Sequence, residues 1–374
     1  MSNRKKISLC DPQLGEGEKR ALCEVIDSGW LTMGERVAEF ERQFAAMHHN
    51  ETAVAVSSCT AALHLALAAL GIGPGDEVLV PAMTFIATVN AVIYTGATPV
   101  LVDIESASSP HISLEHARSL CTPKTKAVII MHYGGYLMDL DKWHDFSRSR
   151  NMALVEDSAH APATGGVGRI ADISTFSFFP NKNMTTAEGG MILSRNPEVL
   201  ERTRRMRSHG LTHSTLERDR GRVFSYDVVE LGLNYRMDEL RAAIGLVQLR
   251  SLAKWNERRR ELTVLYRLKI AEELPEVLVP FSEGHETCAH IMPVILPERA
   301  DRTAVMAGLR RENIQSSIHY PPAHKLSHHR DNWFSGVSLP HTEEFAGREL
   351  TLPLHPGMED GDVDIVLDVL KKGL

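Results

Sequence analysis

The chain has 374 residues, of which 43% are hydrophobic and 24% are charged, as is typical of a globular protein with a large core and two domains. A formal net charge of −7 without a long basic block argues against a nucleic-acid-binding surface. The N-terminus lacks a signal-peptide pattern, no apolar run is long enough to cross a membrane, and the five cysteines lack metal-ligand spacing. We therefore expect a cytoplasmic protein that binds no metal, no nucleic acid and no membrane.

Short apolar runs alternate with helix-like segments through the first two hundred residues. This alternation predicts an α/β fold in which helices cover both faces of a mostly parallel, seven-stranded sheet. The predicted strands are residues 53–56, 78–80, 99–102, 127–131, 153–156, 173–178 and 191–193.

The pattern changes beyond residue 205. A polar segment at 209–231 predicts a loop, and helical periodicity follows at 237–274. We then expect a smaller α+β domain, with strands at 277–279, 291–295 and 315–320 and a helix at 302–312. The boundary is predicted near residue 250, so the domains are 1–250 and 251–374.

The first predicted strand ends in a turn suited to a phosphate. It stops at Ser57 and Ser58, and a strongly helical, apolar segment begins near Cys59 and Thr60. Free backbone N–H groups at such a helix start attract anions, although Ser58 or Thr60 can equally serve as an ordinary N-cap. Neither a GxGxxG nor a GxxxxGK[ST] motif is present.

Two later strands end beside ionisable side chains. Asp157 ends the run 153–157, and Lys182 lies on a polar turn after the run 173–179. A lysine held at the end of a buried strand is partly desolvated, which lowers its pKa and favours the neutral amine that attacks carbonyl groups. A lysine that forms an imine and a carboxylate that pairs with a pyridinium nitrogen are the two groups that pyridoxal phosphate (PLP) requires.

At this point the chain resembles the PLP-dependent sugar aminotransferases of the DegT/DnrJ/EryC1/StrS family, which have the aspartate aminotransferase (type I) fold. The resemblance covers the chain nearly from end to end and follows the order of the family's motifs. It is carried by residues 28–32, 57–67, 75–81, 84–88, 94–100, 155–157, 172–190, 207–210, 232–240 and 318–320.

The resemblance implies a role for each matching residue around the cofactor. Lys182 would form the Schiff base and then move the substrate proton, while Asp157 would keep the pyridine nitrogen protonated. Phe85 would stack on the ring. The residues expected to hold the phosphate are Ser58, Cys59, Thr60 and Ser177.

Other positions are expected at the edge of the site. Asn234 would reach the phosphate from the second subunit of a homodimer with shared active sites. His160 stands where the family often has a glutamine near the ring's 3′-oxygen, although a capping or packing role fits it equally well. The candidate substrate contacts come partly from the N-terminal segment 1–50, and they are Trp30, Leu31, Thr32, His319 and Tyr320.

The resemblance implies that an amino group moves from L-glutamate to a nucleotide-linked 4-keto-6-deoxyhexose. Two alternatives stay open: a PLP-dependent sugar dehydratase of the same fold, and a non-catalytic PLP-binding regulatory protein. The dehydratases carry histidine at the position of Lys182, so the lysine favours transamination. The sequence does not identify the residue that binds the donor carboxylate, since Arg207 and Arg236 are both available.

Overall fold

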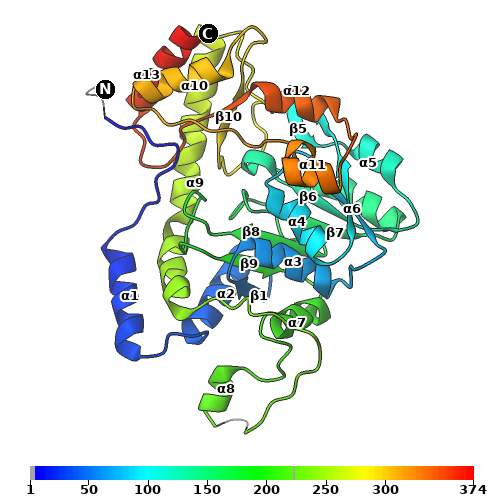
Figure 1. The fold of residues 1–374 in the computed structure, drawn as a ribbon. Helices are drawn as coiled ribbons and strands as arrows, with labels where there is room; N and C mark the ends of the chain where they lie inside the picture. The colour runs from blue at the N-terminus through cyan, green and yellow to red at the C-terminus, as the bar shows by residue number, and fades with distance from the viewer. Residues whose placement is uncertain (1–4, 222–223) are drawn as a thin grey trace.

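A computed structural model describes residues 5–221 and 224–374. Its main feature is a seven-stranded sheet in the order β1-β9-β8-β7-β6-β2-β3 (Figure 1). All neighbouring strands are parallel apart from β9, which is antiparallel to β1 and β8. The predicted sheet is therefore confirmed, and its strands are β1 (Ala53–Val56), β2 (Glu77–Pro81), β3 (Thr98–Val102), β6 (Thr125–Met131), β7 (Ala153–Asp157), β8 (Ile173–Ser177) and β9 (Gly190–Leu193).

Helices pack on both faces because alternate strand residues point in opposite directions. One face packs against α3 (Cys59–Ala69), α4 (Ile86–Tyr94) and α7 (Pro197–Met206). The other face packs against α2 (Glu35–Met47), α5 (Leu114–Leu120), α6 (Leu140–Ser149) and the first half of α9 (Glu239–Glu273). Both faces are therefore apolar, and polar side chains gather where the strands end.

The long helix α9 connects the sheet to a second core. Its N-terminal half packs against α2 and α1 (Glu16–Ser28), and its C-terminal half packs against α13 (Asp360–Gly373) (Figure 1). The second core also contains α10 (Arg302–Arg311) and the antiparallel pair β10 (Met292–Ile295) and β11 (Glu349–Leu352). The expected boundary at residue 250 falls inside this unbroken helix, and the division into domains 1–250 and 251–374 stays a prediction.

Two predicted strands of the C-terminal part are wrong. Residues 277–279 and 315–320 each form only one isolated bridge, Leu278 with Ile295 and Ser317 with Thr351. Prolines follow both segments at positions 280 and 321, where they remove a backbone donor and interrupt any ladder. The remaining elements are short: β4 (Ile104–Ser106), β5 (Ser109–Ile112), α8 (Thr215–Asp219), α11 (Ser327–Asn332), α12 (Pro340–Arg348) and the 3₁₀ turns Tyr133–Gly135 and Ala323–Lys325. Of the described helices, none combines the length and apolarity needed to cross a membrane.

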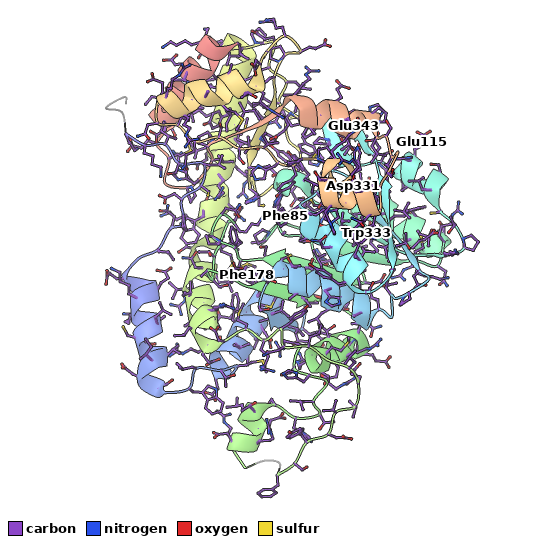
Figure 2. The ribbon with its side chains drawn as sticks, viewed as in Figure 1. Phe85, Glu115, Phe178, Asp331, Trp333 and Glu343 are labelled. Atoms are coloured by element: carbon purple, nitrogen blue, oxygen red, sulfur yellow. The ribbon has the colours of Figure 1, made fainter. Side chains whose placement is uncertain are left out.

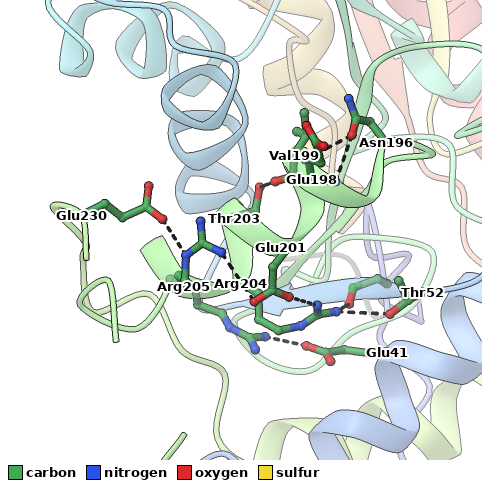
Figure 3. A network of polar contacts seen from close by, with 12 residues as sticks. Glu41, Thr52, Asn196, Glu198, Val199, Glu201, Thr203, Arg204, Arg205 and Glu230 are labelled. Carbon is green, nitrogen blue, oxygen red and sulfur yellow. Dashed lines mark hydrogen bonds and ion pairs between the residues drawn. The ribbon is translucent and has the colours of Figure 1, made fainter. Parts of the chain in front are cut away.

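Arginines of α7 and of the loop after it form ion pairs with neighbouring segments of the chain. Figure 3 shows Arg204 paired with Glu201 and Arg205 paired with Glu230, and all four side chains are partly exposed. Arg207 is different, because it is only 3% exposed, donates to the Ala55 carbonyl oxygen at 2.7 Å and pairs with the buried Glu41 of α2. The Arg207 guanidinium is therefore already engaged, and it is not available for a donor carboxylate.

We expect Glu41→Ala to destabilise the fold by about 3–5 kcal/mol, because it leaves the Arg207 charge buried and unpaired. Urea unfolding monitored by circular dichroism measures this change. The control is Glu201→Ala, which removes an exposed ion pair with Arg204 and should change the unfolding free energy by less than about 1 kcal/mol. Equal effects of the two substitutions would contradict the assignment of Arg207 as a buried structural charge.

Candidate active site

A cavity of about 530 Å³ lies at the carboxyl ends of the parallel strands. Ten of the residues selected from the sequence line it together: Ser58, Cys59, Thr60, Phe85, Asp157, His160, Ser177, Lys182, His319 and Tyr320. They come from separate parts of the chain and meet here because parallel strands end at one edge of the sheet. The cavity is the candidate active site.

The turn between β1 and α3 presents free amides to the cavity. Ser58 is the N-cap of α3, since its Oγ accepts from the Ala61 N–H at 3.1 Å. The N–H groups of Cys59 and Thr60 open the helix, and no acceptor for them occurs among the described residues. At Gly190 an added Cβ would lie 2.6–2.8 Å from backbone atoms of Ser58 and Cys59, so glycine allows β9 to pack against this turn. The turn therefore fits an anionic phosphate.

Phe85 provides an aromatic surface at the cavity. It is the N-cap residue of α4, and 55% of its surface is exposed although it lines the cavity (Figure 2). Its ring centroid lies 5.8 Å from that of Tyr320 at an interplanar angle of 54°. An exposed aromatic ring beside a phosphate-binding turn is suited to stacking on a flat heteroaromatic ring.

Asp157, the last residue of β7, carries a buried carboxylate. One oxygen accepts from the Thr88 hydroxyl at 2.7 Å and the other accepts from the Ala159 N–H at 3.2 Å. Burial raises the pKa of Asp157, and the Thr88 hydrogen bond opposes part of that shift. No lysine or arginine forms an ion pair with it in the described part of the chain. A protonated ring nitrogen would supply the missing positive charge.

Thr88 was not selected from the sequence, although it belongs to the segment 84–88. Its hydroxyl lies 2.8 Å from that of Thr84 and donates to Asp157. Because α4 follows β2 in the chain while Asp157 belongs to β7, the contact depends on tertiary packing. The sequence feature that could have identified Thr88 is its hydroxyl, one helical turn after Phe85.

Lys182 lies on the turn that leaves β8. Its backbone N–H donates to the Phe179 carbonyl oxygen at 2.9 Å, and its Nζ has no hydrogen-bond partner among the described residues. Burial lowers the pKa of Lys182 to about 8, and the nearby Cys59 and Asp157 oppose part of that shift. The neutral amine is therefore accessible near physiological pH, as Schiff-base formation requires.

We expect the reactivity of Lys182 toward an acylating reagent to rise with pH and to level off above about pH 8, because only the neutral amine reacts. Trace labelling of the cofactor-free protein with acetic anhydride between pH 6 and 10, followed by peptide mass spectrometry, measures the midpoint. Exposed lysines in the same digest supply the reference, with an ordinary pKa of about 10.4. A midpoint for Lys182 equal to that reference would contradict the lowered pKa.

His160 and Tyr320 form a fixed pair at the cavity wall. The His160 Nδ1 accepts from the Gly134 N–H at 3.2 Å, so its proton lies on Nε2, which is 2.8 Å from the Tyr320 hydroxyl. Burial lowers the pKa of His160 well below its usual range, which keeps the ring neutral. His160 therefore holds Tyr320, and the Tyr320 proton is left to donate into the cavity.

Four predicted residues do not line this cavity. Asn234 is exposed on the loop before α9. Trp30, Leu31 and Thr32 lie near the start of the same helix, where the Leu31 carbonyl oxygen accepts from the Glu239 N–H at 3.1 Å. All four therefore lie near the N-terminal end of α9 and outside the lining of the cavity that contains Lys182.

These contacts fit PLP. The turn before α3 offers free amides for a phosphate, Phe85 offers a stacking surface, and Asp157 offers a buried carboxylate that lacks a cation. Lys182 lines the same cavity with an unpartnered amine. The described residues contain no group of three histidine, cysteine or acidic side chains placed to hold a metal ion.

Comparison with known proteins agrees with this arrangement. The model of the DegT/DnrJ/EryC1/StrS aminotransferase family matches residues 12–371. The aminotransferase TlmJ of Streptoalloteichus hindustanus is 33% identical, with a TM-score of 0.89 and 99% of each chain covered. A protein of Streptococcus pneumoniae named as a sugar aminotransferase, known in PLP and PMP forms, is 30% identical in the PLP form, with a TM-score of 0.88 and 98% of each chain covered. The structure of DesI with its TDP-sugar product is 28% identical, with a TM-score of 0.87, and 99% of this chain and 93% of that chain are covered.

Proposed function

Because the chain belongs to the DegT/DnrJ/EryC1/StrS family and is a PLP-dependent sugar aminotransferase, we propose that it moves the amino group of L-glutamate to a nucleotide-linked 4-keto-6-deoxyhexose. The observation that carries the proposal is the unpartnered amine of Lys182 in one cavity with the buried Asp157. The structure of DesI in the presence of its TDP-sugar product supports the choice of a nucleotide-linked sugar.

Different residues of the chain would bind different parts of PLP. The amides of Cys59 and Thr60, with the Ser177 hydroxyl, would hold the phosphate. Phe85 would stack on the ring and exclude water from one of its faces. Asp157, oriented by Thr88, would keep the ring nitrogen protonated. PLP, when bound, supplies the electron sink that makes the substrate carbon acidic.

Lys182 moves the protons. Its free amine would take the proton from the α-carbon of the amino donor and would deliver it to the cofactor on the other side of the amino nitrogen. A base with a pKa near neutrality is suited to both directions, and burial lowers the pKa of Lys182 to about 8. The same sequence in reverse places the amino group on the keto-sugar.

The enzyme is proposed to act as a homodimer with shared active sites. A strip of apolar side chains just before Asn234 is exposed: Phe224 is 99%, Leu231 89% and Val228 55% exposed. Exposed apolar side chains of this kind are typical of a protein interface. Asn234, which follows them in the chain, and Trp30 do not line the cavity of their own chain. A second copy packed on this strip would bring them to its own cavity. Light scattering after size exclusion should show a dimer, and Leu231→Glu should yield monomers with impaired cofactor binding.

The absorption spectrum tests the aminotransferase proposal. Wild-type protein with PLP should show a lysine-bound chromophore that L-glutamate bleaches and a nucleotide-linked keto-sugar restores. A chromophore that glutamate leaves unchanged would favour another donor or the non-catalytic alternative. Loss of the sugar's hydroxyl without amino transfer would favour the dehydratase, which the lysine at position 182 argues against.

All five cysteines are unpaired, in keeping with the cytoplasmic location that is part of the proposal.

A further inference from the structure

A line of three buried polar side chains leads from the second core to the cavity. Glu349 and Thr351 lie on the same face of β11, two residues apart, and they are 0% and 1% exposed. His319 is 6% exposed and lines the cavity. The three side chains belong to two segments, β11 and the loop that carries His319, and nothing in the cofactor site described above uses Glu349 or Thr351.

The hydrogen bonds connect them in series. The Thr351 Oγ1 lies 2.5 Å from the Glu349 Oε1 and 2.8 Å from the His319 Nδ1. The other carboxyl oxygen, Oε2, accepts from the His319 backbone N–H at 2.9 Å. The remaining ring nitrogen of His319, Nε2, has no partner among the described residues. The chain of contacts therefore ends at a nitrogen that is free to meet a ligand.

Among the residues that the structure describes, no cation forms an ion pair with the carboxyl group of Glu349. The ionisable groups near Glu349 are Tyr133, Tyr320 and Arg302, and the Arg302 guanidinium donates to backbone oxygens. Burial raises the pKa of Glu349 to about 8, opposed by its hydrogen bonds with Thr351 and His319. Burial, with a smaller contribution from the nearby Lys182, lowers the pKa of His319 to about 4. At neutral pH Glu349 is therefore a carboxylic acid and His319 a neutral imidazole.

This charge state fixes the hydrogen positions. When Glu349 is ionised, the Thr351 hydroxyl donates to its Oε1. When Glu349 is protonated, Oε2 still accepts the His319 N–H, so the proton lies on Oε1 and is donated to Thr351. The Thr351 hydroxyl then donates to the His319 Nδ1, which leaves the His319 proton on Nε2. When Glu349 loses its proton, each hydrogen bond reverses, and Nε2 becomes an acceptor.

We infer that His319 is a catalytic residue that exchanges a proton with the carbonyl oxygen of the substrate sugar, and that Thr351 and Glu349 are positioning residues that relay this proton. The inference rests on the proposed function and names a proton donor for the oxygen that the sugar must lose. In the forward step the bond between the sugar carbon and its oxygen breaks as the bond to the incoming amino nitrogen is completed, and the oxygen departs as water with two protons. The first proton comes from the amino group that attacks the carbonyl, and the second comes from His319 Nε2. The Thr351 proton moves to Nδ1, the Glu349 proton moves to the Thr351 Oγ1, and Glu349 is left as a carboxylate while the nitrogen bound to the sugar carbon keeps the positive charge.

Nuclear magnetic resonance of full-length protein labelled with ¹⁵N-histidine tests the relay without turnover. His319→Gln assigns the signal among the 18 histidines. We expect His319 to carry its proton on Nε2 at pH 6.5 and on Nδ1 above a midpoint near pH 8, where Glu349 ionises. In Glu349→Gln, whose side chain cannot ionise, Nε2 should stay protonated throughout. A wild-type tautomer that does not change between pH 6.5 and 9.5, or an unaltered midpoint in Glu349→Gln, would overturn the relay.

Steady-state kinetics test the catalytic part. Thr351→Val interrupts the series and should lower kcat with the sugar by about 10²-fold, whereas Thr351→Ser should stay within about twofold. Tyr133→Phe is the structural control. It removes a hydroxyl that donates to the His319 carbonyl oxygen and that is not one of the hydrogen bonds between Glu349, Thr351 and the His319 ring. The pH midpoint of the His319 tautomer change should therefore stay near 8 in this variant. Unchanged kcat in Thr351→Val would refute the relay while amino transfer stands. Absence of transfer to any keto-sugar in wild type would refute the proposed function, and the resonance experiment would still decide whether Glu349 controls His319.

Discussion

Lys182→Ala is expected to abolish amino transfer, with turnover reduced by at least about 10⁴-fold, because both the imine-forming amine and the proton-transfer group are lost. The variant should still bind PLP through the phosphate turn, Phe85 and Asp157, since these contacts are independent of the lysine. Absorption spectra before and after addition of L-glutamate, with product analysis over hours, measure both properties.

The matched control for this variant is Lys254→Ala, which removes an exposed lysine of α9. Its spectrum and turnover should equal those of wild type. Added small primary amines should restore part of the activity of Lys182→Ala, because the vacated space allows them to transfer the proton. Wild-type turnover by Lys182→Ala would contradict the role of this lysine.

Asp157→Asn is expected to lower the rate of the glutamate half-reaction by about 10²–10³-fold. The amide keeps the size of the side chain and can still accept from Thr88, but it cannot hold a proton on the ring nitrogen. Removing one partner of a buried charged pair costs about 2–5 kcal/mol, and each 1.36 kcal/mol corresponds to a factor of ten in rate. Stopped-flow measurement of chromophore bleaching gives the rate directly.

The hydroxyl of Thr88 provides a graded comparison for the Asp157 result. Thr88→Ser keeps the hydrogen bond to Asp157 and should stay within about twofold of wild type. Thr88→Val removes it and should slow the half-reaction by about tenfold, as expected for one lost hydrogen bond to a charged group. If Asp157→Asn and Thr88→Val both behaved like wild type, the carboxylate would have no part in activating the cofactor.

The sheet could be predicted from sequence because each of its strands is a short apolar run bounded by turn residues. The C-terminal strands were harder to predict, since residues 277–279 and 315–320 have strand-like composition but meet a partner at only one position. The strand β11 was not predicted, although its alternation of Glu349 and Thr351 with leucines is typical of a half-exposed strand. In the structure both polar residues are buried, which this alternation does not predict. Their burial is compensated by hydrogen bonds to His319, which sequence spacing does not reveal.

The site was predictable where a residue type alone indicates chemistry. Lys182 and Asp157 follow strands that end at the same edge of the sheet, and the structure places both at one cavity. Contacts that depend on how elements pack could not be predicted in this way. These include the hydrogen bond from Thr88 to Asp157 and the fixed orientation of His160 by the Gly134 amide. Asn234 and Trp30 show a further limit, since the cavity of their own chain does not contain them.

The most direct test of the account is the transfer of ¹⁵N from labelled L-glutamate to a nucleotide-linked keto-sugar, followed by mass spectrometry of the sugar product. The purified enzyme with PLP should produce an amino sugar that carries the ¹⁵N label, in an amount equal to the 2-oxoglutarate released, and Lys182→Ala should produce none. Release of 2-oxoglutarate without label in any 4-keto or 3-keto sugar tested would contradict the proposed acceptor. If the wild-type enzyme with bound PLP released no 2-oxoglutarate, glutamate would be excluded as the donor.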